Sequence, residues 1–232
     1  MTDQKLLEHL QGLLTDRRID LFEIVLNQRT DHFTVVAQDV YQLHNTSAVV
    51  RSCDVFGIQN LHIIEENLPR RIDKEIAMGA QKWLSLEAHD DAQALVARLK
   101  SEGRIVAATD LSPGAVDFGE VDWKNGRHAL VFGNEEVGIS EELRNLADVR
   151  VRLPMRGLAE SLNLSVSVGA ALAHVDAKGA LVPDLTVEER DLLLLRWSLL
   201  SVRAGRELLR REGVALEQGV LKTRASVLGY TT

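Results

Sequence analysis

The stretch RLPMRGLAESLNLSVSVGAALAH, residues 152–174, decides how the fold of this chain is interpreted. Polar and apolar residues alternate from Ser161 to Val168, a pattern that predicts a β-strand because strand side chains point to alternate faces. The small residues that follow, VGAALAHV, predict a packed helix instead. Both interpretations leave Pro154 and Gly157 as backbone breakers beside an apolar segment. The surrounding sequence has to decide between them.

Short apolar runs alternate with amphipathic segments before this stretch. Strands are predicted at 32–38, 61–64, 104–109 and 128–133, and helices at 45–57 and 90–103. This alternation predicts an α/β fold with a mostly parallel sheet and helices on both faces. Ligands bind such sheets at the carboxyl ends of the strands, so we expect a site in the loops after Ala108 and Phe132.

The composition excludes several classes of function. The net charge of −7 gives no general attraction for nucleic acid or anionic membranes, so an RNA partner would have to meet a local basic patch. Cys53 is the only cysteine and the seven histidines show no metal-ligand spacing, so we expect no metal. The most apolar segment, DLLLLRWSLLSV, is interrupted by Arg196 and is too short to span a bilayer. Without a signal peptide or membrane segment, a cytoplasmic protein is expected.

Both ends of the chain have helical patterns. Leucines recur at helical spacing in residues 3–15, and a second apolar stripe begins after Thr186. Three arginines, Arg196, Arg203 and Arg210, lie a heptad apart beside this second stripe. They indicate either a solvated helix face or an arm that contacts RNA phosphates.

Two further segments carry residues suited to a functional site. NTSAVVRSCD, residues 45–54, places Asn45 and Arg51 nearly two helical turns apart, and we expect both to face one site. In VFGNEEVGIS, residues 131–140, two glycines allow the backbone to approach a ligand closely, beside an acidic pair. Taken singly, each segment is also compatible with a simple helix cap or an exposed acidic turn.

Taken together with the opening stretch, these segments resemble the three motifs of the SpoU/TrmH family in the SPOUT superfamily of RNA methyltransferases. The similarity covers about residues 33–175. It implies a C-terminal deep trefoil knot, and it places SLNLSVSVGAALAH at the start of the last core helix, which we favour over a strand. It also implies three regions: an N-terminal helical extension (1–30), the methyltransferase domain (31–178) and a C-terminal helical extension (179–232) that contacts RNA and a second subunit.

The resemblance assigns a role to each matched residue. S-adenosyl-L-methionine is the expected cofactor, and the residues expected to bind it are Thr109, Gly133, Leu153, Met155 and Leu162. The expected catalytic residues are Arg51, Asn45, Glu135, Ser161 and Asn163. An arginine keeps its proton at neutral pH, so we interpret Arg51 as a fork that orients the ribose hydroxyl and a phosphate rather than as a base.

The short flanks resemble family members that methylate tRNA. We therefore expect S-adenosylmethionine-dependent 2′-O-methylation of a tRNA ribose, at guanosine-18 of the D-loop, by a homodimer. Alternatives within the same chemistry are ribosomal RNA or another tRNA position. An RNA-binding protein with a silent site is a different class, which the intact motifs disfavour. A nicotinamide-dependent enzyme is a weaker alternative because the glycine fingerprint is absent.

Overall fold

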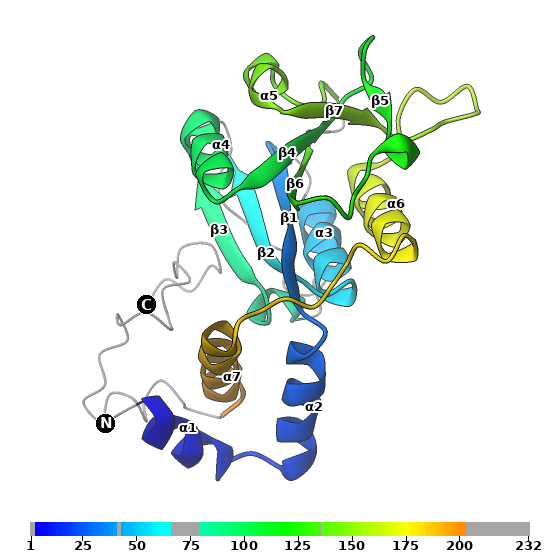
Figure 1. Ribbon diagram of the computed structural model, residues 1–232. Coiled ribbons are helices and arrows are strands. Elements are labelled where there is room, and N and C mark those ends of the chain that lie inside the picture. The colour runs from blue at the N-terminus through cyan, green and yellow to red at the C-terminus, as the bar shows by residue number, and fades with distance from the viewer. Residues whose placement is uncertain (1–2, 41–42, 66–78, 135, 203–232) are drawn as a thin grey trace.

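The fold is organised around a parallel sheet that runs through the centre of the molecule (Figure 1). The computed structural model describes residues 3–40, 43–65, 79–134 and 136–202. Seven strands lie in the order β3-β2-β1-β6-β4-β7-β5, and every neighbouring pair is parallel. The predicted α/β class with a mostly parallel sheet is therefore confirmed.

The strands are β1 (Thr30–Gln38), β2 (Ile58–Ile64), β3 (Ser85–His89), β4 (Arg104–Thr109), β5 (Val116–Asp117), β6 (Arg127–Phe132) and β7 (Val149–Arg152). The helices are α1 (Asp3–Gln11), α2 (Asp16–Leu26), α3 (Leu43–Val55), α4 (Ala92–Ser101), α5 (Glu141–Leu146), α6 (Leu164–Ala177) and α7 (Val187–Ser201), with short 3₁₀ turns at Ala80–Lys82 and Phe118–Glu120. The four predicted strands correspond to β1, β2, β4 and β6, and the two predicted helices to α3 and α4.

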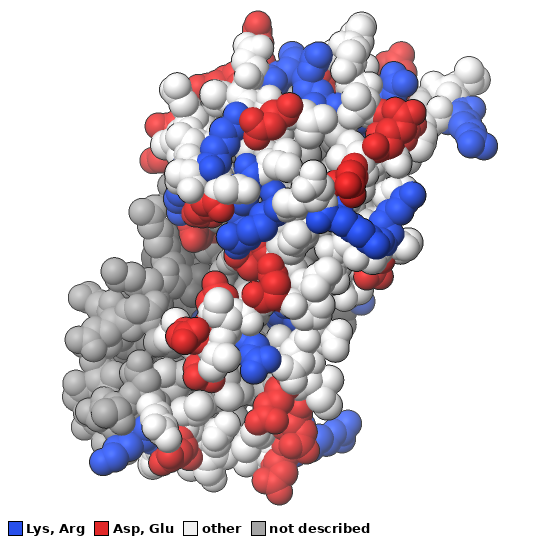
Figure 2. Space-filling view, in the orientation of Figure 1, with Lys and Arg blue, Asp and Glu red and all other residues white. Residues whose placement is uncertain are grey.

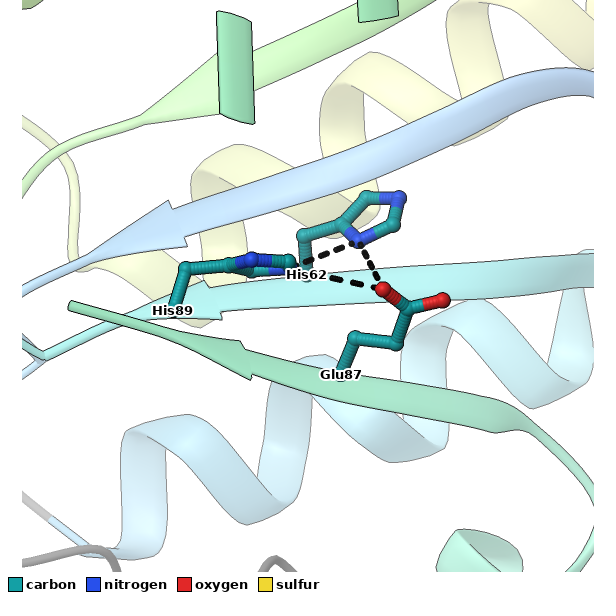
Figure 3. Close-up of side chains that lie close together, drawn as sticks. All are labelled: His62, Glu87 and His89. Atoms are coloured by element: carbon teal, nitrogen blue, oxygen red, sulfur yellow. Dashed lines mark hydrogen bonds and ion pairs between the residues drawn. The ribbon is translucent and has the colours of Figure 1, made fainter. Parts of the chain in front are cut away.

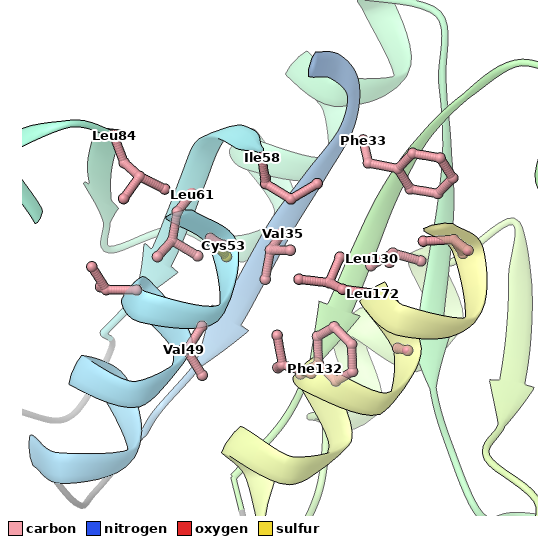
Figure 4. Close-up of a cluster of buried hydrophobic side chains, with 14 of the residues drawn as sticks. Phe33, Val35, Val49, Cys53, Ile58, Leu61, Leu84, Leu130, Phe132 and Leu172 are labelled. Atoms are coloured by element: carbon pink, nitrogen blue, oxygen red, sulfur yellow. The ribbon is translucent and has the colours of Figure 1, made fainter. Parts of the chain in front are cut away.

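Helices cover both faces of the sheet, as the alternating pattern predicts. Adjacent residues of β1 point in opposite directions, so Val35 joins the core beneath α3 and α6, and Val36 joins the core beneath α4 and α5. Figure 4 shows the first core, in which side chains of α3 and α6 pack against β1 and β6. Because the central strands are covered on both faces, their side chains are almost all buried.

Residues 164–174 of the opening stretch lie in the helix α6, and the strand interpretation of residues 161–168 is wrong. Asn163 is the N-cap of α6, and its side-chain oxygen accepts a hydrogen bond from the Ser165 backbone N–H at 2.9 Å. The buried residues of α6 recur every three or four positions, so tertiary burial, not the local alternation, sets the period: Leu164, Val168, Ala171, Leu172 and Val175. A Cβ built on Gly169 would lie 3.9 Å from Ser52 Oγ, so this glycine faces α3 at ordinary contact distance.

Three helices gather at the amino edge of the sheet, where α1 and α2 pack against α7 (Figure 1). The α7 helix begins with a capping box between Thr186 and Glu189. The Asp184 carboxylate, just before it, accepts hydrogen bonds from the backbone N–H groups of Asp31 and His32 at 2.6 and 3.1 Å. This carboxylate ties the entry to α7 to the start of β1.

The prediction that Arg196 contacts RNA is wrong. Its side chain is buried, with 5% of the residue exposed, and Nη2 donates a hydrogen bond to the Leu84 carbonyl oxygen at 2.8 Å. Burial lowers the pKa of this guanidinium to about 10. A heptad spacing places the arginine on one helix face but does not say whether that face is exposed. The remaining members of the set, Arg203 and Arg210, lie outside the described residues.

The trefoil knot and the three domain boundaries remain predictions. Among the described residues, no helix combines the length and apolar character that crossing a membrane requires.

Candidate functional site

A cavity of about 410 Å³ opens where the carboxyl ends of β6, β4 and β7 meet. Thr109 ends β4, Gly133 follows β6, and Leu153 follows β7. These strands are neighbours in the sheet, so parallel pairing brings three chain segments to one edge. The two loops in which the sequence predicts a site both contribute to this cavity.

The structure brings most of the motif residues together. The five predicted cofactor-binding residues all line the cavity: Thr109, Gly133, Leu153, Met155 and Leu162. Ser161, a predicted catalytic residue, lines it as well. The first turn of α6 closes one side through Leu164 and Ser167. Residues of two motifs, 131–140 and 152–174, therefore line a single cavity together with Thr109, and no residue of the first motif lines it.

Gly133 occupies a position that no other residue can fill. A Cβ at this position would lie 2.0 Å from the Gly138 carbonyl carbon and 2.2 Å from the Ile139 nitrogen. The loop between them is closed by two backbone hydrogen bonds between Asn134 and Gly138, each 3.1 Å long. The Asn134 side chain stabilises the turn, because its Oδ1 accepts hydrogen bonds from the backbone N–H groups of Glu136 and Val137, at 2.9 and 2.8 Å. The absence of a side chain is what lets the cavity loop fold back on itself.

Asp110, the residue after Thr109, also lines the cavity, and the motifs did not reveal it. Its carboxylate accepts hydrogen bonds from the hydroxyl of Ser112, from Arg144 Nε at 3.2 Å and from Arg150 Nη1 at 3.4 Å. Burial raises the pKa of Asp110, but the Ser112 hydrogen bonds and the Arg144 guanidinium outweigh this and hold the pKa below its ordinary value. A fixed carboxylate therefore lies in the cavity wall. The only sequence signal is its position directly after a strand.

Two predicted catalytic residues form a pair beside the cavity. Asn163 Nδ2 donates a hydrogen bond to Asn45 Oδ1 at 3.1 Å, across 118 positions of sequence. Asn45 lies near the start of α3 and is 1% exposed, and Asn163 lies between the cavity-lining residues Leu162 and Leu164. The hydrogen bond therefore joins α3 to the chain segment that forms the cavity.

Arg51 is not in the cavity wall. It is exposed on α3, whereas Asn45 is buried, so the expectation that both share one helix face is wrong. Six residues advance a helix by about 600°, which leaves the two side chains about 120° apart around the axis. Arg51 instead presents its guanidinium to solvent. Glu135, the remaining predicted catalytic residue, lies outside the described residues.

Comparisons with known proteins agree with this geometry. The family model described as the SpoU rRNA Methylase family matches residues 32–173. The tRNA (guanosine(18)-2′-O)-methyltransferase of Borreliella burgdorferi is 32% identical over 70% of this chain and 74% of its own. The crystal structure of the A. aeolicus TrmH/SpoU tRNA modifying enzyme is 34% identical, with a TM-score of 0.74 over 81% of this chain and 98% of that one. An AdoMet-bound rRNA methyltransferase from Sinorhizobium meliloti is 26% identical, with a TM-score of 0.56 over 63% of this chain and 56% of that one. The chain therefore belongs to the SpoU methylase family.

Proposed function

We propose that this protein transfers a methyl group from S-adenosyl-L-methionine to the ribose 2′-hydroxyl of guanosine-18 in the D-loop of tRNA. The observation that carries the proposal is the cavity at three parallel strand ends, lined by all five residues that the family motifs assign to the cofactor. Relatives at 32–37% identity over most of the chain are named for this activity.

The cavity suits such a cofactor in size and lining. Its volume of about 410 Å³ lies within the range of about 300–1,000 Å³ typical of small-molecule sites. The closed loop at Gly133 lines the cavity through Gly133, Asn134 and Gly138, and its backbone groups would bind the cofactor. When bound, S-adenosylmethionine supplies an electrophilic methyl group. Leu153, Met155 and Leu162 would provide apolar contacts to it.

Arg51 would act on the RNA side of the reaction. A ribose hydroxyl is a poor nucleophile and has to lose its proton as it attacks. The Arg51 guanidinium stays protonated, so it binds a substrate phosphate as a bidentate donor and stabilises the charge that develops on the attacking oxygen. Its exposure on α3 suits contact with a large substrate that approaches from solvent.

The hydrogen-bonded pair of Asn45 and Asn163 would fix the position of α3 relative to the cavity. The hydrogen bond from Asn163 to Asn45 fixes the start of α3, which carries Arg51, against the segment that lines the cavity. Ser161 lines the cavity, and its hydroxyl would orient the ribose. Such positioning matters because misplacing reacting groups by about 1 Å can cost a hundredfold in rate.

Basic side chains near the cavity mouth would meet the RNA backbone. On the face shown in Figure 2, basic and acidic side chains are interspersed rather than segregated. Arg152 is exposed and lines the cavity, so it takes the place of Arg196 among the proposed phosphate contacts. Arg203 and Arg210 stay in the proposed set.

The active form is a homodimer in this proposal. Large apolar side chains are exposed close to the cavity, where Leu162 is 40%, Val166 53% and Leu158 104% exposed. We assign these exposed apolar side chains to the interface, since apolar side chains that gather in a patch mark interaction sites. Light scattering on the purified chain tests this point, because a stable monomer that methylates RNA would contradict it.

The decisive experiment follows a labelled methyl group from S-adenosylmethionine onto RNA. An unmodified tRNA transcript is incubated with the protein, and the labelled nucleotide is mapped. The matched control is the same transcript with 2′-deoxyguanosine at position 18, which lacks only the acceptor hydroxyl. Ribosomal RNA is tested in parallel.

Label on guanosine-18 that disappears with the deoxy control supports the proposal. Label at another tRNA ribose, or on ribosomal RNA alone, overturns the proposed target and keeps the chemistry. Binding of S-adenosylmethionine without transfer to either RNA overturns the methyltransferase proposal.

A further inference from the structure

A second group of side chains lies on the other half of the sheet, away from the cavity. His62 projects from β2, and Glu87 and His89 project from the neighbouring edge strand β3 (Figure 3). The parallel register pairs residue 62 with residue 87, and residues 87 and 89 point to the same face because strand side chains alternate. Two imidazoles and a carboxylate thus converge on one point.

The spacing of these three groups matches a metal site. His62 Nδ1 lies 3.2 Å from His89 Nε2 and 3.9 Å from Glu87 Oε2, and the last two atoms are 3.7 Å apart. A point equidistant from all three atoms is about 2.1 Å from each of them. Zinc bonds to imidazole nitrogen at about 2.0–2.1 Å and to carboxylate oxygen at about 2.0–2.2 Å. An ion of this size therefore fits between the three atoms with little movement of the chain.

In the structure, the guanidinium of Arg98 contacts two of these three side chains. Arg98 of α4 pairs with Glu87 through Nη1 at 2.8 Å, and its Nη2 donates a hydrogen bond to His62 Nδ1 at 3.3 Å. Arginine has no acceptor, so His62 Nδ1 is the acceptor in this hydrogen bond and carries its lone pair. His89 Nε2 then donates the hydrogen bond to His62 Nδ1. To bind an ion through Nε2, His89 has to adopt its other neutral tautomer, with the proton on Nδ1.

The Arg98 guanidinium has a second carboxylate within reach. Its side chain is 41% exposed, and its Nε already lies 3.7 Å from Oε1 of Glu102, the C-cap residue of α4. The other nearby guanidinium, that of Arg104, is held by carboxylates of Asp31 and Glu102. A divalent ion can therefore replace the Arg98 guanidinium at Glu87, and Arg98 keeps a carboxylate partner when it moves.

We infer that His62, Glu87 and His89 form a zinc site that Arg98 closes in the absence of the ion, with water completing the coordination. Two imidazoles and one carboxylate suit zinc better than magnesium or calcium, which prefer oxygen ligands. The bound ion would link the edge strand β3 to β2. This site is separate from the proposed methyl transfer and does not depend on it. Sequence spacing missed it because the ligands come from two strands.

The test is zinc binding by the full chain, stripped of metal with a chelator and desalted. Zinc is titrated by calorimetry, with magnesium as the ion expected not to bind, and cobalt is substituted to detect tetrahedral coordination by its visible absorption. The variants are Glu87→Gln, His89→Ala and Arg98→Ala. The matched control is His9→Ala, which removes an exposed histidine of α1. Thermal unfolding in chelator verifies that each variant folds.

We expect one zinc per chain. Glu87→Gln and His89→Ala should weaken binding by at least about tenfold, because each removes a ligand. Arg98→Ala should bind zinc several-fold more tightly, because the competing cation is gone, and His9→Ala should behave as the parent. Equal affinity in the parent and both ligand variants, or no stoichiometric binding, would overturn the inference. An unchanged affinity in Arg98→Ala would overturn the exchange between zinc and arginine.

Discussion

Replacing Gly133 with alanine should open the cavity loop. The new Cβ would lie 2.0 Å from the Gly138 carbonyl carbon, whereas ordinary van der Waals contacts of a Cβ are 3.4 Å or longer. Both contacting groups are backbone, so no side chain can rotate away, and the two segments must separate by about 1.4 Å. The two hydrogen bonds between Asn134 and Gly138, each 3.1 Å long, cannot survive that movement.

The size of the effect follows from those two hydrogen bonds. Each contributes about 0.5–1.5 kcal/mol, so closing the loop becomes less favourable by about 1–3 kcal/mol. If the cofactor binds only the closed loop, its affinity falls by the same free energy, or roughly 5- to 150-fold. Calorimetric titration with S-adenosylmethionine measures this affinity, and urea unfolding measures the stability of the fold.

Two glycine variants serve as controls. Gly157→Ala meets no atom closer than 3.9 Å, so it should bind the cofactor as the parent does. Gly138→Ala has open space around its Cβ but a φ of +73°, so it should cost about 1 kcal/mol through backbone strain alone. Parental cofactor affinity in Gly133→Ala, together with a parental urea midpoint, would refute the argument from the backbone collision.

Three further outcomes are expected. Arg51→Ala should lower the single-turnover rate of methyl transfer by about 100- to 1,000-fold and leave cofactor affinity unchanged, because Arg51 does not line the cavity; a parallel loss of affinity would contradict this. Asn163→Ala should cost about 1–2 kcal/mol in urea unfolding, whereas Asn163→Ser keeps a cap for α6 and loses only the contact with Asn45; equal costs would show that the cap contributes nothing. Burial, reinforced by His32, lowers the pKa of His128 to about 4. Between this pH and about 6.5, His128 therefore binds a proton in the unfolded chain but not in the folded chain. Stability should therefore fall as the pH drops from about 6.5 to about 4, by up to about 3 kcal/mol, and His128→Phe should show a shallower fall in urea unfolding than the parent.

The sequence predicts the central strands well because their signal is local. The buried run at 104–109 coincides with β4, and the runs in β1, β2 and β6 are equally continuous. The edge strand β3 has the sequence SLEAH, with only two apolar residues, and β7 is VRVR. Such short strands are defined by their neighbours in the sheet, so the sequence pattern does not reveal them.

The site is predictable only in part, for the same reason. Gly133 is recognisable in the sequence because the close approach of two backbone segments requires a glycine at this position. The hydrogen bond between Asn163 and Asn45 depends on how α3 meets α6, and the group at His62 depends on the register between β2 and β3. Arg196 shows the opposite error, since its charge suggested exposure, whereas it is buried and donates a hydrogen bond to the Leu84 carbonyl oxygen.

The position of β1 in the sheet has a consequence during synthesis. This strand pairs with β2, which ends at Ile64, and on its other edge with β6, which ends at Phe132. A ribosome that adds about 5–20 residues per second needs roughly 5–20 s to make the chain between β1 and the end of β6. Throughout that interval one edge of β1, an interior strand of the folded sheet, has no partner, and its residues Phe33 and Val35 are fully buried only after folding. Nascent chains of this protein therefore expose an unpaired strand edge, which favours aggregation, until more than half of the sequence has been synthesised.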